Sequence, residues 1–145
     1  MLTDSKRLNI AIVLIFIIIL SSFVLGLIYA IFGTFLPYHI AFTGKTESNV
    51  RAYDPELMIL IEAFIRLMGI YVITISIANL FILFFGFCKK EKWAWIYFLI
   101  SVCIMFGSLL IMTFPVLGFS INYFYFVAFL IMGIIALLLS YKEIF

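Results

Sequence analysis

Four long apolar stretches dominate this chain and constrain its fold more than any other feature. Each is about as long as the roughly 20 apolar residues that a helix needs to cross a bilayer. Backbone amides find no water inside lipid, so a segment that crosses the hydrocarbon must be a helix with internal hydrogen bonds. The four stretches occupy residues 8–32, 57–87, 93–114 and 121–140. We therefore predict an all-α membrane protein, a bundle of four transmembrane helices.

The composition supports lipid rather than water as the main solvent of the chain. Of the 145 residues, 68% are hydrophobic and only 11% are charged, whereas soluble domains are closer to half apolar and one quarter charged. The segments between the stretches are too short for a second fold, so residues 1–145 are expected to form one domain. A net charge of +2 without a basic stripe argues against a nucleic-acid partner. The predicted location is the cell (plasma) membrane.

The distribution of lysine and arginine predicts the orientation of the four spans. Cytoplasmic loops of membrane proteins carry an excess of these residues. Six of them fall on one side of the predicted spans: Lys6, Arg7, Lys89, Lys90, Lys92 and Lys142. The opposite side has only Lys45 and Arg51 outside the spans. Both chain ends are therefore expected in the cytoplasm, N-in and C-in.

Two connections are then expected on the outer side. Residues 33–56 form the longer one, which we predict to be a loop, and residues 115–120 a tight turn with Pro115. The longer connection ends in Asp54-Pro-Glu56, which is typical of a helix start: Asp54 caps the first amides and proline takes the first helical position. We therefore expect the second span to begin at Pro55 and to exceed the thickness of the hydrocarbon.

Small residues recur on one face of three spans. In lipid, helices associate through close backbone approach, which small residues permit. The residues concerned are Ser22, Gly26 and Ala30 in the first span, Cys103 and Gly107 in the third, and Gly133, Ala136 and Ser140 in the fourth. These faces predict contacts within the bundle or, alternatively, with a second copy. Cys88 and Cys103 form no CxxC motif, and we expect Cys103 to be a small core residue rather than a redox group.

The second span contains the only charged pair inside an apolar run, Glu62 and Arg66. Their spacing of four residues places them on one helix face in the favourable order for an ion pair. Ionisable residues at membrane depth often mark function, but near the interface the pair would be an ordinary structural contact. Deeper in the same span, Ser76 and Asn79 are expected to bond across helices.

His39 is the sole histidine and is expected near the same outer level as Glu62 and Arg66. A site made of His39, Glu62, Arg66 and Asp54 could bind a ligand, with Arg66 holding an anionic group and His39 or Glu62 handling protons. The alternative is an interfacial histidine bonded to backbone or headgroups. No second histidine or metal-binding spacing accompanies it, so no metal and no cofactor are predicted.

One set of short motifs resembles a known group. They are Pro37-Tyr-His39 with Ala41 and Gly44, then Pro55, Arg66-Leu-Met-Gly69, and Lys90-Glu-Lys-Trp-Ala-Trp95. This set is similar to that of small, functionally uncharacterised prokaryotic membrane proteins with four predicted spans, and the layout loosely resembles DoxX-like proteins. The resemblance implies four membrane helices and draws interest to His39 and Arg66. It assigns no activity, since likeness of fold is not likeness of function.

These observations favour a non-catalytic role. No nucleophile elbow, phosphate-binding glycine loop or similar catalytic motif is present. We expect an accessory or structural subunit that packs in the bilayer against other membrane proteins or a second copy. The alternative is a membrane protein that binds, or acts on, an anionic or lipid-like small molecule at the outer end of the bundle.

Overall fold

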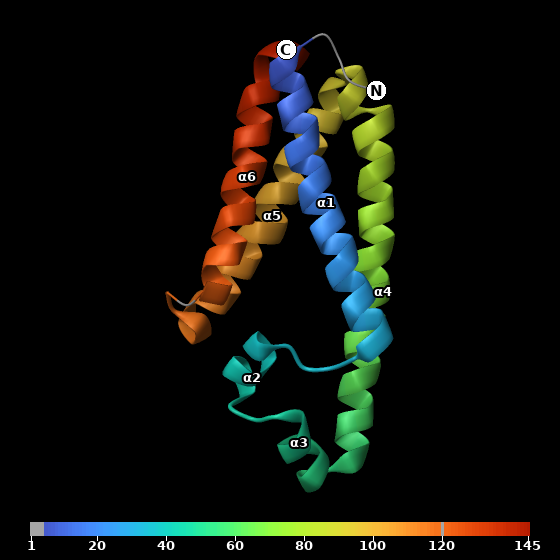
Figure 1. Cartoon of the computed structure of the whole chain (residues 1–145), viewed down its shortest axis with the longest axis vertical. Helices are drawn as coiled ribbons and strands as arrows, with labels where there is room; N and C mark the ends of the chain where they lie inside the picture. The colour runs from blue at the N-terminus through green and yellow to red at the C-terminus, as the bar shows by residue number, and fades with distance from the viewer. Residues whose placement is uncertain (1–4, 120) are drawn as a thin grey trace. The chain divides into compact units, whose positions relative to one another are not determined.

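The computed structural model describes residues 5–119 and 121–145, and all regular structure in these ranges is helical. The elements are α1 (Lys6–Phe32), α2 (Pro37–Thr43), α3 (Glu47–Tyr53), α4 (Pro55–Phe85), the short 3-10 helix η1 (Phe87–Lys89), α5 (Lys92–Leu117) and α6 (Ile121–Ile144). Figure 1 shows them in chain order. The prediction of an all-α fold is confirmed.

Four of these helices, α1, α4, α5 and α6, are long and apolar enough to cross a membrane. Their positions agree with the four predicted spans. The longest is α4, whose 31 residues correspond to about 46 Å at 1.5 Å per residue. That length exceeds the roughly 30 Å of hydrocarbon, as expected from the sequence. The prediction that both chain ends are cytoplasmic stays a prediction.

The predicted outer loop 33–56 is wrong in one respect, because it contains the two short helices α2 and α3. Local capping explains them. Gly44 ends α2 in the left-handed region at φ 63°, which glycine adopts without strain. Thr46 then starts α3, where its side chain accepts from the amide of Asn49 while Asn49 Oδ1 accepts from the amide of Thr46. This reciprocal capping box has Asn where Glu or Gln is usual at the third helical position, so the sequence pattern did not predict it.

The predicted turn at 115–120 is also wrong, because α5 continues through Pro115 to Leu117. A proline in the last helical turn removes one backbone donor, and so close to the helix end little further structure depends on that bond. Gly118 ends the helix with φ 52°, and its amide donates to the carbonyl of Phe114 at 2.9 Å. Ser120, the last residue of the predicted turn, lies outside the described residues.

The described chain divides into two compact units. Among the described residues, the first comprises 5–21, 77–119 and 121–145, and the second comprises Ser22–Ser76. The helices α1 and α4 contribute to both. The prediction of a single domain is not tested by this division.

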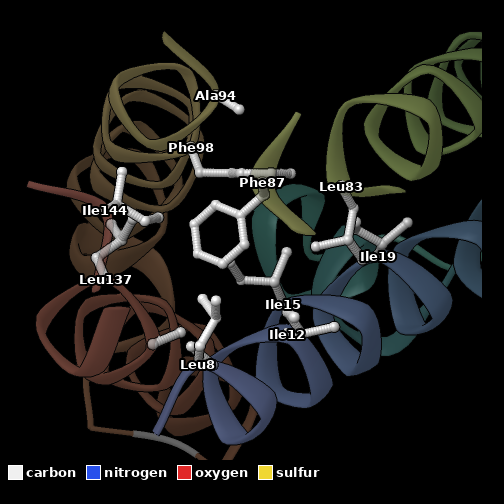
Figure 2. Close-up of a cluster of buried hydrophobic side chains, with 12 residues drawn as sticks. Leu8, Ile12, Ile15, Ile19, Leu83, Phe87, Ala94, Phe98, Leu137 and Ile144 are labelled. Carbon is white, nitrogen blue, oxygen red and sulfur yellow. The ribbon is translucent and has the colours of Figure 1, made fainter. Parts of the chain in front are cut away.

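The core of the first unit surrounds Phe87, which is fully buried in the 3-10 helix after α4. Its ring meets the ring of Phe98 edge-on at a centroid distance of 5.6 Å. Figure 2 shows apolar side chains of α1 and α6 closing the cluster, Leu8, Ile12, Ile15, Leu137 and Ile144 among them. Leu8, Ile12 and Ile15 follow one face of α1 at helical spacing, so a stripe of this apolar helix becomes part of the core.

The helices α5 and α6 pack through the small-residue face predicted in the fourth span. A Cβ at Gly133 would lie 2.8 Å from Val102, and both Ala136 and Ser140 are fully buried. The indole N–H of Trp95 donates to the carbonyl of Leu137 at 3.1 Å and adds a polar link between the two helices.

The small-residue face predicted in the third span does not face α6. Cys103 is exposed, and nothing lies within 4 Å of a Cβ built at Gly107. The expectation that Cys103 is a core residue is therefore wrong. The reason is that α5 buries the neighbouring face, on which Val102 and Phe106 lie.

In the second unit, α1 and α4 cross at glycines. A Cβ built at Gly69 would lie 2.4 Å from the backbone nitrogen of Ala30 and 2.7 Å from the carbonyl oxygen of Gly26. No side chain larger than hydrogen fits there without moving a backbone. The predicted face of Gly26 and Ala30 therefore forms a close helix crossing, with Gly69 as its partner.

Candidate functional site

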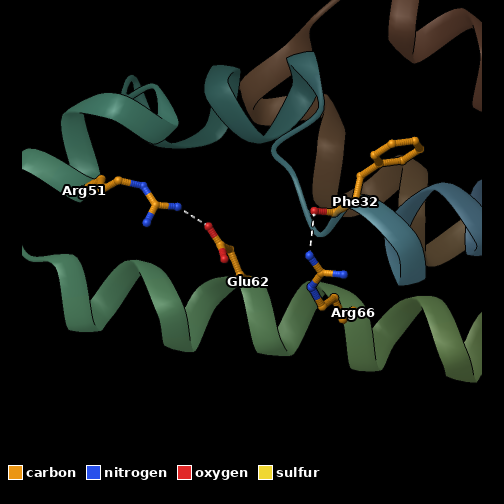
Figure 3. A network of polar contacts seen from close by, with 4 residues as sticks. All are labelled: Phe32, Arg51, Glu62 and Arg66. Carbon is orange, nitrogen blue, oxygen red and sulfur yellow. Dashed lines mark hydrogen bonds and ion pairs between the residues drawn. The ribbon is translucent and has the colours of Figure 1, made fainter.

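Arg66 caps the end of α1. Its guanidinium donates to three consecutive carbonyls of the last α1 turn: Ala30 at 3.2 Å, Ile31, and Phe32 at 3.1 Å. The last carbonyls of a helix have no partner within the helix and carry its negative dipole end. The guanidinium of Arg66 is a planar cation with several donors, so it can both donate to these carbonyls and offset the negative end of the dipole. Figure 3 shows the contact with Phe32.

Gly33 makes room for this contact. It follows α1 with φ 63°, and a Cβ there would lie 2.8 Å from Nε of Arg66. Its own amide donates to the carbonyl of Tyr29 at 2.9 Å. Glycine is therefore needed for both its backbone angle and its lack of a side chain. No local sequence pattern predicts this role, because Arg66 lies far along the chain.

Glu62 pairs with Arg51 of α3 and not with Arg66 (Figure 3). The predicted ion pair four residues apart within α4 is therefore wrong. Each of the two charges has a stronger alternative: Arg66 reaches several uncapped carbonyls, and Glu62 reaches a cation on another helix. The Arg51–Glu62 pair fastens α3 to α4 within the second unit.

His39 lies in the first turn of α2. Its Nδ1 accepts a hydrogen bond from the amide of Leu36 at 3.0 Å. The ring of Tyr29 stacks on the imidazole at 5.7 Å between centroids, and the ring of Phe35 meets it edge-on at 5.8 Å. Desolvation by these surroundings lowers the pKa of His39 from its ordinary value of 6.5. The hydrogen bond from the Leu36 amide agrees with the alternative expected from the sequence, a histidine bonded to the backbone.

Asp54 caps α4, as predicted. Its Oδ1 accepts from the amides of Glu56 and Leu57, both at 3.0 Å. All four predicted site residues thus lie in the second unit. Within the described part of the chain, no hydrogen bond or ion pair joins any two of them, and each helps to hold a helix end or a helix pair.

Three further polar residues were not identified as site candidates. Tyr29 is 4% exposed, and its hydroxyl has no hydrogen-bond partner among the described residues. In the first unit, Asn79 of α4 accepts from the hydroxyl of Tyr97 of α5 at 2.6 Å, which confirms the predicted bond across helices. Ser76 instead donates within its own helix, to the carbonyl of Val72 at 2.8 Å.

A groove of about 470 Å³ lies beside α3 in the second unit. It is lined by Lys45, Asn49, Val50, Tyr53 and Leu57. The lining thus offers a cation and an amide together with apolar and aromatic surface. Among the residues that the structure describes, no three His, Cys, Asp or Glu side chains gather as a metal site would require.

Comparison with known proteins adds no relative. No protein-family model matches the chain, no curated protein matches it, and no solved structure matches it. The resemblance to small prokaryotic four-span proteins and to the DoxX-like layout therefore stays a prediction beyond the four apolar helices themselves.

Proposed function

We propose that this protein is a non-catalytic subunit of the cell membrane that works by packing against another membrane protein or a second copy. The observation that carries the proposal is the start of α4. Arg66 binds the last turn of α1, so residues 55–65 continue past the end of α1 by about 16 Å.

The side chains on this projecting part of α4 are largely apolar. Ile59, Leu60 and Phe64 are 62%, 52% and 57% exposed. In this proposal the hydrocarbon ends where α1 ends, and apolar surface beyond that limit is costly unless something covers it. Another protein chain is a suitable cover, because the polar neighbours Arg51 and Glu62 are already paired with each other.

The polar chemistry of the second unit supports the same role. Arg66, Glu62 and Asp54 are engaged in helix capping or in an ion pair within the chain. A catalytic group must be able to reach a substrate, and these groups are engaged in holding the fold. We therefore propose a structural contribution from them rather than acid–base chemistry.

Photo-crosslinking tests the proposal. A photoreactive amino acid replaces Phe64, or Ile104 of α5 as a matched lipid-facing control, in the full chain in its native membrane. We expect a discrete protein adduct from position 64 and diffuse or no protein adducts from position 104. Two results together would contradict the proposal. They are the absence of a protein adduct from both positions, and a protein that is a monomer after purification in mild detergent.

The second candidate function is the binding of an anionic, lipid-like molecule at the outer end. The groove beside α3 favours it, because Lys45 can attract a negative headgroup while Val50 and Leu57 can contact a chain. Arg66 and His39 would then support the binding region from within. Lys45→Gln should weaken the binding of anionic lipid in this case, and Lys142→Gln at the other end of the chain should not.

A further inference from the structure

A small cavity in the first unit carries two polar side chains. Its volume is about 40 Å³, and it is lined by Asn79 of α4 and Ser101 of α5. The other walls are apolar, with Ile15 and Ile19 of α1 and Phe98 of α5 among them. The two polar groups therefore meet a largely hydrocarbon surface.

The hydrogen-bonding capacity of these two side chains is only partly used. Asn79 accepts one bond, from the Tyr97 hydroxyl at 2.6 Å. A carboxamide also carries two N–H donors, and the structure gives these donors no partner within the described residues. The hydroxyl of Ser101 likewise has no partner in that part of the chain.

The depth of the cavity makes this arrangement costly. Ser101 lies nine residues after the start of α5 at Lys92, which corresponds to about 13 Å along the helix. Outside the protein at that depth lies hydrocarbon, which can neither donate nor accept a hydrogen bond. An amide or hydroxyl without a partner there raises the free energy of the protein, and hydrogen bonds to a bound polar molecule would offset this cost.

We propose that this cavity binds a single water molecule that links α4 to α5 inside the membrane. The volume admits one water, which needs about 10–15 Å³ of accessible space and at least two polar partners. The water accepts from the amide of Asn79 and donates to the hydroxyl of Ser101. With the Tyr97 bond, the result is a hydrogen-bonded chain from Tyr97 through Asn79 and the water to Ser101.

Other occupants fit less well. The cavity is too small for an acyl chain or a metabolite. A cation requires several oxygen ligands, but the oxygen of Asn79 already accepts from Tyr97. The donors that remain on Asn79 favour an acceptor, which water provides.

Water-edited solid-state NMR of the full chain in lipid nanodiscs tests the proposal. The experiment measures magnetisation transfer from water to the side-chain amide of ¹⁵N-labelled Asn79. We expect clear transfer in the parent protein. Ser101→Val fills the cavity with methyl groups and removes the hydroxyl, so the transfer should be lost.

Two variants serve as controls. Ser108→Val changes an exposed serine of the same helix, whose hydroxyl donates to the carbonyl of Met105, and should leave the transfer intact. Tyr97→Phe should also leave it intact, since the water and not the tyrosine hydroxyl delivers the magnetisation. Absence of transfer in the parent protein, persistence in Ser101→Val, or loss in Tyr97→Phe would overturn the proposal. If Ser101→Val does not fold, a structure of the parent protein in lipid, at a resolution that shows water molecules, provides the test instead. A cavity without water in that structure would overturn the proposal.

Discussion

At the scale of single residues, the charged groups of the second unit act on helix ends. Arg66 bonds the carbonyls that end α1, Asp54 bonds the amides that begin α4, and His39 bonds the amide that precedes α2. Helix termini expose unpaired backbone groups that side chains must satisfy. The polar residues of this largely apolar chain are thus placed where the backbone most needs partners.

Removal of the Arg66 guanidinium is expected to destabilise the protein. Arg66→Ala leaves three α1 carbonyls without their cap. We expect a loss of about 1 kcal/mol, less than the roughly 1.5–3 kcal/mol of a charged hydrogen bond, because the side chain is exposed. Arg66→Lys should reduce the stability by a smaller amount. Its ammonium keeps the positive charge at the helix end, but it cannot reach all three carbonyls at once.

The measurement is the free energy of unfolding by detergent titration. Arg51→Ala, which removes only an exposed ion pair, serves as the control and should change stability by no more than about 0.5 kcal/mol. Equal stability of the parent protein and Arg66→Ala would show that the cap is dispensable.

Acid is expected to loosen α2 through His39. Protonation places a hydrogen on Nδ1, where the imidazole now accepts from Leu36. Burial lowers the pKa of His39 below 6.5, so between the lowered value and 6.5 the unfolded segment binds more protons than the folded one. The stability of α2 therefore falls as the pH falls through this window and is fully present above it.

Hydrogen exchange of the α2 amides, corrected for the intrinsic pH dependence, measures this effect. Protection should fall below pH 6.5 in the parent protein and stay level in His39→Gln, whose amide oxygen can accept without titrating. The amides of α3, capped by Thr46, provide an internal reference. A pH response that persists in His39→Gln would assign it to another group.

Single residues also show where sequence reasoning reached its limit. The cap at Asp54 could be predicted, because its partners follow within three residues. The partners of Glu62 and Arg66 could not, because Arg51 and the α1 carbonyls lie 11 and 34 or more residues away. Helical spacing finds only neighbours on the same helix, and it therefore paired the two charges with each other.

At the scale of helices, close crossings depend on glycine. The backbones of α1 and α4 approach each other at Gly69, where the space for a methyl group is already taken by Ala30 and Gly26. Gly107, which also lies in a membrane helix, faces open space. The two positions offer a matched pair that separates helix packing from the helix propensity of glycine.

Gly69→Ala is expected to destabilise the protein, because overpacking typically costs about 1–3 kcal/mol. Gly107→Ala should be neutral or slightly stabilising, since alanine favours a helix and nothing obstructs its methyl group. Unfolding of both variants under the same conditions gives the comparison. Similar stabilities for the two would mean that α1 and α4 can separate at no cost.

Among the helices, the long ones were predictable and the short ones were not. The length of the apolar stretches was enough to predict α1, α4, α5 and α6, because a helix that crosses the bilayer needs about 20 apolar residues. The helices α2 and α3 depend on caps such as Thr46 and Gly44, which act over a few residues only. Pro115 suggested a turn, yet it lies within the last turn of α5, where proline is tolerated.

At the scale of the whole molecule, the distribution of charge predicts the orientation. Six lysines and arginines fall on the side that is predicted to hold both chain ends, so this side is expected in the cytoplasm. Single cysteines at Ser48 and at Lys142, introduced into a background without Cys88 and Cys103, test it. We expect a membrane-impermeant thiol reagent to label position 48 from outside in intact cells and to label position 142 only after permeabilisation.

The reverse labelling pattern would invert the topology and would place the projecting start of α4 in the cytoplasm. The proposed partner would then be sought on that side of the membrane. Labelling of both positions in intact cells would instead be inconsistent with the three crossings, an odd number, that are predicted between them.

The contact between Arg66 and the end of α1 also bears on the order in which the chain is made. The carbonyls of Ala30, Ile31 and Phe32 leave the ribosome before Arg66 does. When α4 enters the bilayer, the groups that compensate its arginine are therefore already in place. An unrelated apolar helix without the glycines at positions 26 and 33 would keep Arg66 from reaching the last carbonyls. A nascent chain with this helix as its first span should insert its second span less efficiently, and Arg66→Leu should restore that efficiency.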